Sequence, residues 1–184
     1  EEIHSRQVIV AAGSFSASIS GGDGDFVRYA PTIPVRGQML ALRAEGLRLL
    51  HVVRSHRGYL VPRRDGRIIA GSTLEDTGFA KEVTPEGMRK IRDASIEMIP
   101  ALEKAEIVER WAGLRPGSPD ELPILGPTDI EGLLIATGHY RNGILLAPVT
   151  AKLVREWVVL GKTSFDARMF SPLRFTASQS AHPR

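Results

Sequence analysis

The sequence predicts a mixed fold of the α+β or α/β class, with a largely antiparallel sheet that carries a helix. Two continuous apolar runs that end in glycine, residues 7–13 and 132–138, are typical of buried strands, the first in a parallel sheet. Residues 59–71 contain two strand-like runs around an Asp-Gly pair, the usual signal of a β-hairpin. From Ile144 onward the apolar residues follow a helical spacing.

The composition is typical of a soluble globular protein. The chain has 184 residues, of which 42% are hydrophobic and 24% charged, enough for one domain or two intimate parts. The absence of cysteine excludes a disulfide framework and thiolate metal sites. No apolar run reaches the ~18 residues of a membrane span, and no signal peptide is visible, so we expect a cytoplasmic protein. Because the first residue is Glu1 rather than Met, we expect a trimmed chain or a fragment.

The net charge of +3 requires nucleic-acid binding to be considered. The densest basic patch falls on the predicted hairpin and its approach, and consists of Arg54, His56, Arg57, Arg63, Arg64 and Arg67. It contains one tyrosine and no series of stacking aromatic residues, so charges that discourage edge-to-edge strand pairing are the simpler explanation. We therefore predict no nucleic-acid partner. We also predict no metal site, because His51 and His56 do not share a strand face.

The first half of the chain reads mainly as strands. After the strand at 7–13, residues 20–25 form a Gly-rich loop, followed by strands at 34–42 and 49–54 and the hairpin. The Gly22-Asp23-Gly24 stretch is not a phosphate-binding fingerprint, because it lacks a third glycine and a following helix.

The second half alternates helix and strand. Residues 72–83 are a polar connection, and Thr84 with Pro85 is a helix start of the N-cap type. The helix that follows has a core stripe interrupted at Pro100, and a strand returns at 105–114. The last helix has the apolar stripe Leu146, Val149, Leu153, Trp157 and Leu160 and ends at Gly161. Residues 166–184 form an irregular, polar C-terminal tail.

Arg115 is the first candidate for binding. Alternation along the strand places Trp111, Gly113 and Arg115 on one face, and Gly113 leaves room for a flat group against the backbone. Pro116 stiffens the strand end that directs the guanidinium, which suits a carboxylate held through two hydrogen bonds. A salt-bridged surface arginine beside a turn remains an equal alternative.

The turn at residues 139–143 is the second candidate. A buried strand, a Gly-rich turn and a helix start together present free backbone N–H groups and the positive end of a helix dipole. Such a place stabilises an anion or a reduced, negatively charged ring. The alternative is an ordinary connection between a strand and a helix.

Three motifs resemble one family. They are Trp111-Ala112-Gly113-Leu114-Arg115-Pro116-Gly117, Pro123-Ile124-Leu125-Gly126, and the run from Gly138-His139-Tyr140-Arg141-Asn142-Gly143 to Pro148. Together they resemble the C-terminal half of the glycine oxidases of thiamine biosynthesis, within the D-amino-acid oxidase family of flavoenzymes. The resemblance extends from about Val8 to Val159. It implies FAD as cofactor, and the C-terminal part of a Rossmann-like FAD-binding domain beside a substrate-binding sheet.

The resemblance also implies roles for residues. Substrate-binding residues would be Arg115, Tyr59 and Arg141, although a half-buried strand tyrosine is the simpler explanation of Tyr59. Cofactor-binding residues would be Ala12, Gly13, Gly113, Arg115, His139, Tyr140, Arg141, Asn142, Gly143, Ile144 and Leu145. No acid–base residue is implied at the substrate Cα. Residues 1–18 and 112–165 would belong to the FAD-binding domain and residues 19–111 to the substrate domain.

The family's N-terminal βαβ unit with Gly-x-Gly-x-x-Gly is missing from this sequence. We therefore expect the C-terminal half of an oxidase that acts on glycine or another small amino acid with O₂ as electron acceptor. The N-terminal segment or a partner chain would supply the rest, and the resemblance implies a homo-oligomer. A non-catalytic module that completes a flavoprotein partner is the alternative.

Overall fold

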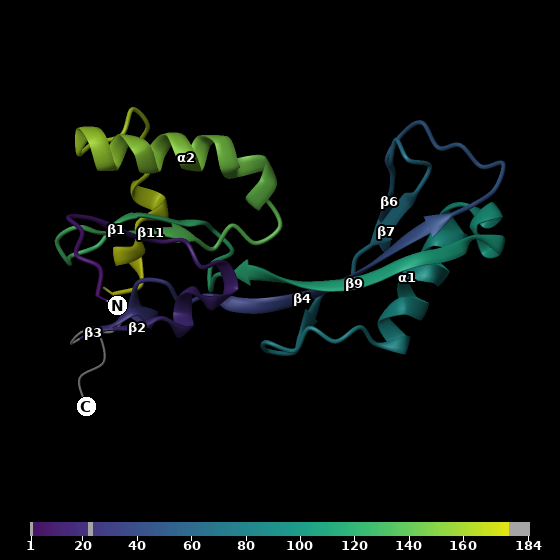
Figure 1. Cartoon of the computed structure of the whole chain (residues 1–184), viewed down its shortest axis with the longest axis horizontal. Helices are drawn as coiled ribbons and strands as arrows, with labels where there is room; N and C mark the ends of the chain where they lie inside the picture. The colour runs from purple at the N-terminus through teal and green to yellow at the C-terminus, as the bar shows by residue number, and fades with distance from the viewer. Residues whose placement is uncertain (1, 22–23, 177–184) are drawn as a thin grey trace. The chain divides into compact units, whose positions relative to one another are not determined.

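The chain consists of two compact units (Figure 1). In this computed structural model, residues 2–21 and 24–176 are described. Unit 1 comprises Glu1–Pro34 and Arg115–Arg184, and unit 2 comprises Val35–Leu114. The sequence-based boundaries lay at residues 18 and 111 instead, so residues 19–34 group with unit 1.

A three-stranded sheet forms the centre of unit 1. Its order is β1 (Val8–Val10), β11 (Leu133–Thr137) and β10 (Ile124–Pro127). The predicted parallel pairing of the first strand is confirmed, because β1 runs parallel to β11, whereas β10 runs antiparallel to it. Among the described residues β1 lies at the sheet edge and pairs with β11 alone. Val8 and Ile9 are consequently 52% and 43% exposed.

Helix α2 (Gly143–Leu160) covers one face of this sheet (Figure 1). It ends as predicted at Gly161, whose φ of 66° is left-handed. The predicted apolar stripe is wrong in part, since Leu153 is buried but Val149 and Leu160 are exposed. The helix instead buries Glu156, whose carboxylate accepts hydrogen bonds from the backbone N–H and hydroxyl of Ser164.

Short elements complete unit 1. Residues of the predicted loop at 20–25 pair as β2 (Ser20–Gly21) and β3 (Gly24–Asp25), while residues 22–23 lie outside the described part. The segment expected to be a tail packs against β10 through the short helices η4 (Arg168–Phe170) and η5 (Pro172–Arg174). Its last part, residues 177–184, lies outside the described residues. The remaining short helices are η1 (Gly13–Ser18) and η2 (Phe26–Arg28).

Unit 2 is built on the predicted antiparallel sheet. Its strands are β4 (Ile33–Arg43), β5 (Val53–Ser55), β6 (Gly58–Pro62), β7 (Ile68–Gly71), β8 (Glu75–Asp76) and β9 (Glu106–Gly117). The order is β5-β6-β7-β4-β8, and β9 also pairs with β4. The hairpin β6–β7 is confirmed, with Tyr59 opposite Gly71. The strand expected at 49–54 is shorter and later, because it begins only at Val53.

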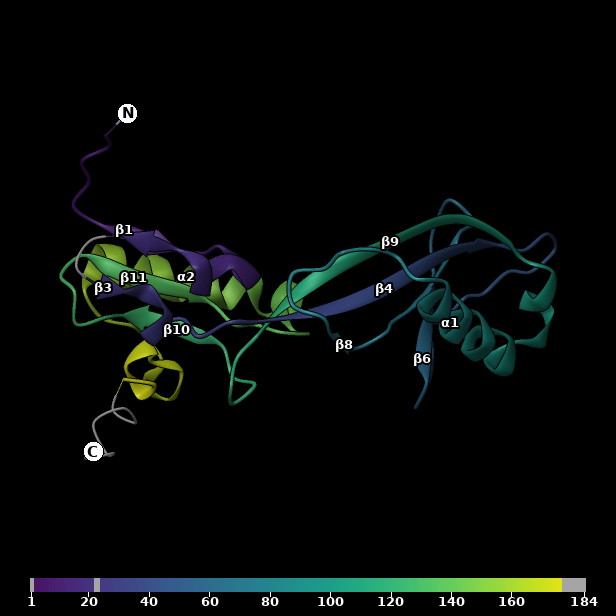
Figure 2. The ribbon, with the colours of Figure 1, turned by 90° about the horizontal axis from the view of Figure 1, so that it is seen from below.

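Helix α1 (Pro85–Met98) packs on this sheet (Figure 2). The predicted cap is confirmed, since the Thr84 hydroxyl accepts a hydrogen bond from the Gly87 N–H at 3.1 Å. The helix stops before Pro100, where η3 (Pro100–Lys104) begins. The core of the unit includes Leu40, Leu42, Leu60, Ile68, Met88, Ile91 and Leu102.

Candidate active site

The carboxyl ends of the two parallel strands of unit 1 meet at one edge of the sheet. The Thr137 hydroxyl at the end of β11 donates to the Gly13 carbonyl at 3.0 Å, just after β1. The Ser16 hydroxyl in turn donates to the Thr137 hydroxyl at 3.0 Å. The predicted residues Ala12 and Gly13 therefore lie beside the start of the turn that follows β11. Ligands of α/β sheets bind at this kind of edge.

The turn after β11 is held in an unusual backbone conformation. Gly138 has a φ of 72°, and a Cβ at this position would lie 2.8 Å from Ile124 Cγ1, so glycine is required. Tyr140 has a φ of 50°, which is uncommon for a residue with a side chain. The Tyr140 N–H donates to the Pro116 carbonyl at 2.9 Å, and the Asn142 N–H donates to the His139 carbonyl at 2.9 Å. The first bond joins the turn to the strand end that carries Arg115.

His139 anchors the turn to the helix behind it. Its Nε2 lies 2.8 Å from the hydroxyl of Thr150, a residue of α2. Burial of the half-buried ring lowers the pKa of His139 below its ordinary value, which favours the neutral form of the ring. A neutral imidazole adds no positive charge next to the positive end of the helix dipole.

The first turn of α2 presents backbone donors to the surface. The N–H groups of Gly143, Ile144 and Leu145 have no partner inside the helix, and Asn142 supplies no side-chain cap. The side chains of Ile144 and Leu145 are 97% and 78% exposed. An apolar surface with polarised N–H groups is suited to the electron-rich edge of a flat ring.

Gly113 and Arg115 lie on β9, and Arg141 lies in the turn itself. A Cβ at Gly113 would meet nothing within 4 Å, so packing within the described residues does not explain the glycine. Arg115, at the end of β9, is half-buried, and Arg141 is exposed in the turn. The structure thus brings Ala12, Gly13, Arg115 and the predicted residues from His139 to Leu145 into one region of unit 1, whereas Gly113 belongs to unit 2.

Tyr59 belongs to unit 2. Its hydroxyl donates to the Met39 sulfur at 3.5 Å, and the Arg54 guanidinium lies 5.9 Å from the centre of its ring. These contacts fit a half-buried strand tyrosine, and its place in a substrate pocket stays a prediction.

Ser14 is a residue that the sequence-based prediction left out of the site. It is 4% exposed, and its hydroxyl has no hydrogen-bond partner among the described residues. A buried hydroxyl without a partner is unfavourable unless a ligand supplies one. The signal in the sequence was its position directly after the Ala-Ala-Gly end of the strand.

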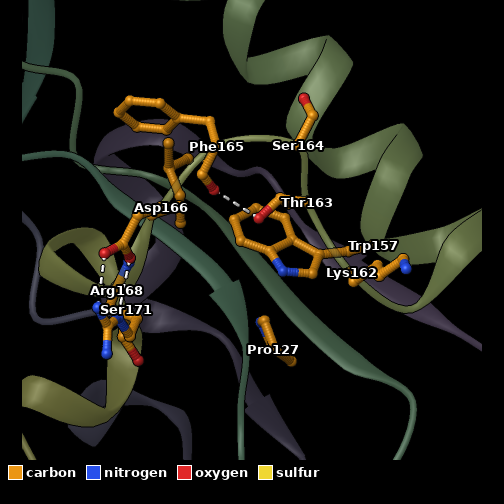
Figure 3. A pocket seen from close by; sticks show the side chains of 11 residues that line it. Pro127, Trp157, Lys162, Thr163, Ser164, Phe165, Asp166, Arg168 and Ser171 are labelled. Carbon is orange, nitrogen blue, oxygen red and sulfur yellow. Dashed lines mark hydrogen bonds and ion pairs between the residues drawn. The ribbon is translucent and has the colours of Figure 1, made fainter.

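Another hollow of unit 1 lies elsewhere (Figure 3). It has a volume of about 600 Å³ and lies at the end of α2, between Trp157 and Phe165. Asp166 and Arg168 on its wall bind each other, and none of the predicted site residues lines it. Within residues 2–21 and 24–176, no three potential ligands gather as they do around a metal. The helices in the same part of the chain are too short or too polar to cross a bilayer.

The sequence of the chain matches a known family. Residues 1–157 match the family described as DAO, FAD dependent oxidoreductase. The chain belongs to this family.

Relatives in the family of FAD-dependent oxidoreductases include named oxidases. The chain is 38% identical to a glycine oxidase of Pseudomonas aeruginosa, over 93% of this chain and 46% of the relative. It is 41% identical to a bifunctional protein ThiO/ThiG of Synechocystis sp., over 91% of this chain and 27% of the relative. The crystal structure of glycine oxidase from Geobacillus kaustophilus superimposes with a TM-score of 0.82 at 33% identity, covering 91% of this chain and 45% of that one. The chain thus spans less than half the length of these relatives.

FAD is the cofactor of the family, and the described residues fit part of it. The unpartnered Ser14 hydroxyl and the open N–H groups at the start of α2, both in unit 1, are the features that a flavin ring would use. The Gly-rich unit that holds the pyrophosphate in this family is not part of this sequence.

Proposed function

We propose that this chain is the C-terminal half of an FAD-dependent oxidase of small amino acids, of the glycine oxidase type. The reaction would convert glycine or a similar amino acid to an imine, which water hydrolyses to a 2-oxo acid and ammonia. O₂ would take up the electrons and leave as H₂O₂. Such an enzyme would supply the thiazole branch of thiamine biosynthesis. The observation that carries the proposal is the hydrogen bond between Tyr140 and Pro116, which joins the turn to the strand end of Arg115.

The role of Arg115 would be to hold the substrate carboxylate. A guanidinium at the end of a strand stiffened by Pro116 offers two parallel donors at a fixed place. Tyr59 and Arg141 would add hydrogen bonds to the same substrate. Because the carboxylate fixes one end of the amino acid, its Cα–H can be oriented without a general base.

The chemistry of electron uptake would come from FAD, which accepts a hydride from the substrate Cα when bound. The contribution of the chain would be electrostatic. The N–H groups of Gly143, Ile144 and Leu145 and the dipole of α2 would stabilise negative charge that develops at the ring edge. The neutral His139 would hold the turn through Thr150.

The experiment uses the chain co-expressed with the N-terminal half of the Pseudomonas aeruginosa glycine oxidase. We expect a yellow complex that produces H₂O₂ from glycine. Arg115→Met should raise KM for glycine by about 100-fold or more, the loss expected for a paired, charge-assisted contact. Arg43→Met is the matched control, because Arg43 is exposed on β4 and lies outside the predicted site.

Two results would contradict the proposal. A complex that assembles but takes up no flavin would exclude the FAD-binding role. An unchanged KM in Arg115→Met would remove Arg115 from carboxylate binding. A flavin-containing complex without turnover would favour the alternative, a module that completes a flavoprotein without catalysing the reaction.

A further inference from the structure

A pocket with three arginines lies within unit 2, and none of the predicted site residues lines it. It has a volume of about 530 Å³ and is formed by the first turns of α1 and by β9. Its apolar wall consists mainly of Val83, Met88 and Ile107. The arginines on its wall are Arg89, Arg92 and Arg110. A volume of this size, with an apolar wall and few polar groups, is typical of sites for small organic molecules.

Arg92 is fixed in place without losing its charge. Its guanidinium donates to the Glu103 carbonyl at 2.7 Å and to the Ala105 carbonyl at 3.3 Å. Both acceptors are neutral backbone groups, so the orientation is set while the positive charge stays uncompensated. A pre-oriented arginine loses little conformational entropy when it binds an anion.

The other two arginines add to the positive charge. None of the ion pairs among the described residues involves Arg89, Arg92 or Arg110. Glu86, an acidic neighbour of Arg89, binds Lys90 at 2.7 Å, and the pKa of Glu86 is lowered mainly by Lys90 and to a smaller extent by the charge of Arg89. The pocket also lies at the N-terminal end of α1, where the helix dipole is positive.

We propose that this pocket binds a small amphipathic organic anion, with a carboxylate at the arginines and an aliphatic or aromatic body against Met88 and Ile107. A simple inorganic anion would leave the apolar wall exposed, and a neutral apolar molecule would leave the positive charge of the arginines without an anionic partner. Only a molecule with both parts satisfies both features. The site is therefore a second carboxylate-binding place on this chain, besides the one proposed at Arg115, and it takes acids with an apolar body.

The test is NMR of the full chain with labelled methionine and isoleucine methyl groups, titrated with octanoate. We expect saturable shifts of the Met88 and Ile107 signals. Octylammonium, which has the same body and the opposite charge, should give none, and acetate should bind at least about tenfold more weakly because it lacks the apolar chain.

Two variants test which arginines bind the carboxylate of octanoate. Arg92→Met and Arg110→Met should each weaken octanoate binding about tenfold, as expected for the loss of one charge-assisted hydrogen bond. Arg110 is exposed, so its variant carries the test if Arg92→Met does not fold. Arg43→Met, outside the pocket, should leave the affinity unchanged.

Any of three outcomes would overturn the proposal. They are no saturable shift at Met88 and Ile107, an equal response to octylammonium, and an unchanged octanoate affinity in Arg110→Met.

Discussion

At the scale of single residues, the turn after β11 depends on a few positions with unusual backbone angles. Gly138 has a left-handed φ and also lies against Ile124. The position therefore requires both the backbone freedom of glycine and the absence of a side chain. Tyr140 adopts a similar angle with a side chain present. The turn at the proposed flavin edge therefore contains two residues with left-handed backbone angles, and one of them carries a side chain.

We expect Gly138→Ala to lower the free energy of unfolding by about 2–4 kcal/mol, because the backbone strain adds to a contact of the new Cβ with Ile124. Gly161→Ala is the matched control. Its φ of 66° is similar, but a Cβ there meets nothing within 4 Å, so its cost should be about 1 kcal/mol. Urea unfolding followed by tryptophan fluorescence measures both values, and equal losses would mean that the close approach to Ile124 costs nothing.

The sequence could predict which residues gather in this turn but not how they are held. Gly-His-Tyr-Arg-Asn-Gly is recognisable as a turn because of its composition. The hydrogen bond from Tyr140 to Pro116 joins distant parts of the chain, and no local pattern encodes it. The unpartnered hydroxyl of Ser14 likewise becomes visible only when its surroundings are known.

At the scale of elements, local signals were reliable where the chemistry of a turn or cap is specific. The Asp-Gly pair predicted the β6–β7 hairpin, and Thr84-Pro85 predicted the start of α1. The apolar start of the strand predicted at 49–54 is not a strand, and Leu49 packs against the core from a loop. Apolar content predicted that α2 is a helix but not which face is buried, because α2 is apolar on more than one face.

The start of α1 depends on a polar network that includes a fully buried glutamine. Gln38 donates to Glu75 at 2.9 Å and to the Thr84 hydroxyl at 3.0 Å, and accepts from the Thr84 N–H at 2.7 Å. Removing the Thr84 hydroxyl leaves the Gly87 N–H without its acceptor. We therefore expect Thr84→Ala to destabilise the chain by about 1–2 kcal/mol.

Thr84→Ser is the control for this prediction, because it keeps the hydroxyl and should stay within about 0.5 kcal/mol of the wild type. Thermal and urea unfolding of the two variants give the comparison. If both variants were equally stable, the cap would contribute no stability to α1.

At the scale of the whole molecule, β1 indicates where further chain would attach. Among the described residues it pairs with β11 alone, and its apolar side chains are partly exposed. A further parallel strand with its connecting helix would pair with the free edge and cover Val8 and Ile9. This is consistent with a chain that spans less than half the length of its relatives.

We expect Ile9→Lys to prevent assembly with the N-terminal half of the Pseudomonas aeruginosa glycine oxidase, because a lysine without a partner is costly to bury. The yield of flavin-containing complex should fall at least about tenfold, while the stability of the isolated chain changes by less than about 0.5 kcal/mol. Ile130→Lys is the control, since Ile130 is 39% exposed against 43% for Ile9 but follows β10 in a turn. Normal assembly of Ile9→Lys would exclude this face of β1 from the interface.

The division of the chain also sets an order of events during synthesis. Unit 2 is one continuous segment inserted between the two parts of unit 1. All of unit 2 is therefore synthesised before β11, so β1 cannot pair with β11 until unit 2 is complete. The contact between Thr137 and Gly13 spans 124 residues, so the edge that carries the proposed active site closes late. Until then β1 lacks β11 as its partner, so the apolar residues that β11 covers stay accessible to chaperones.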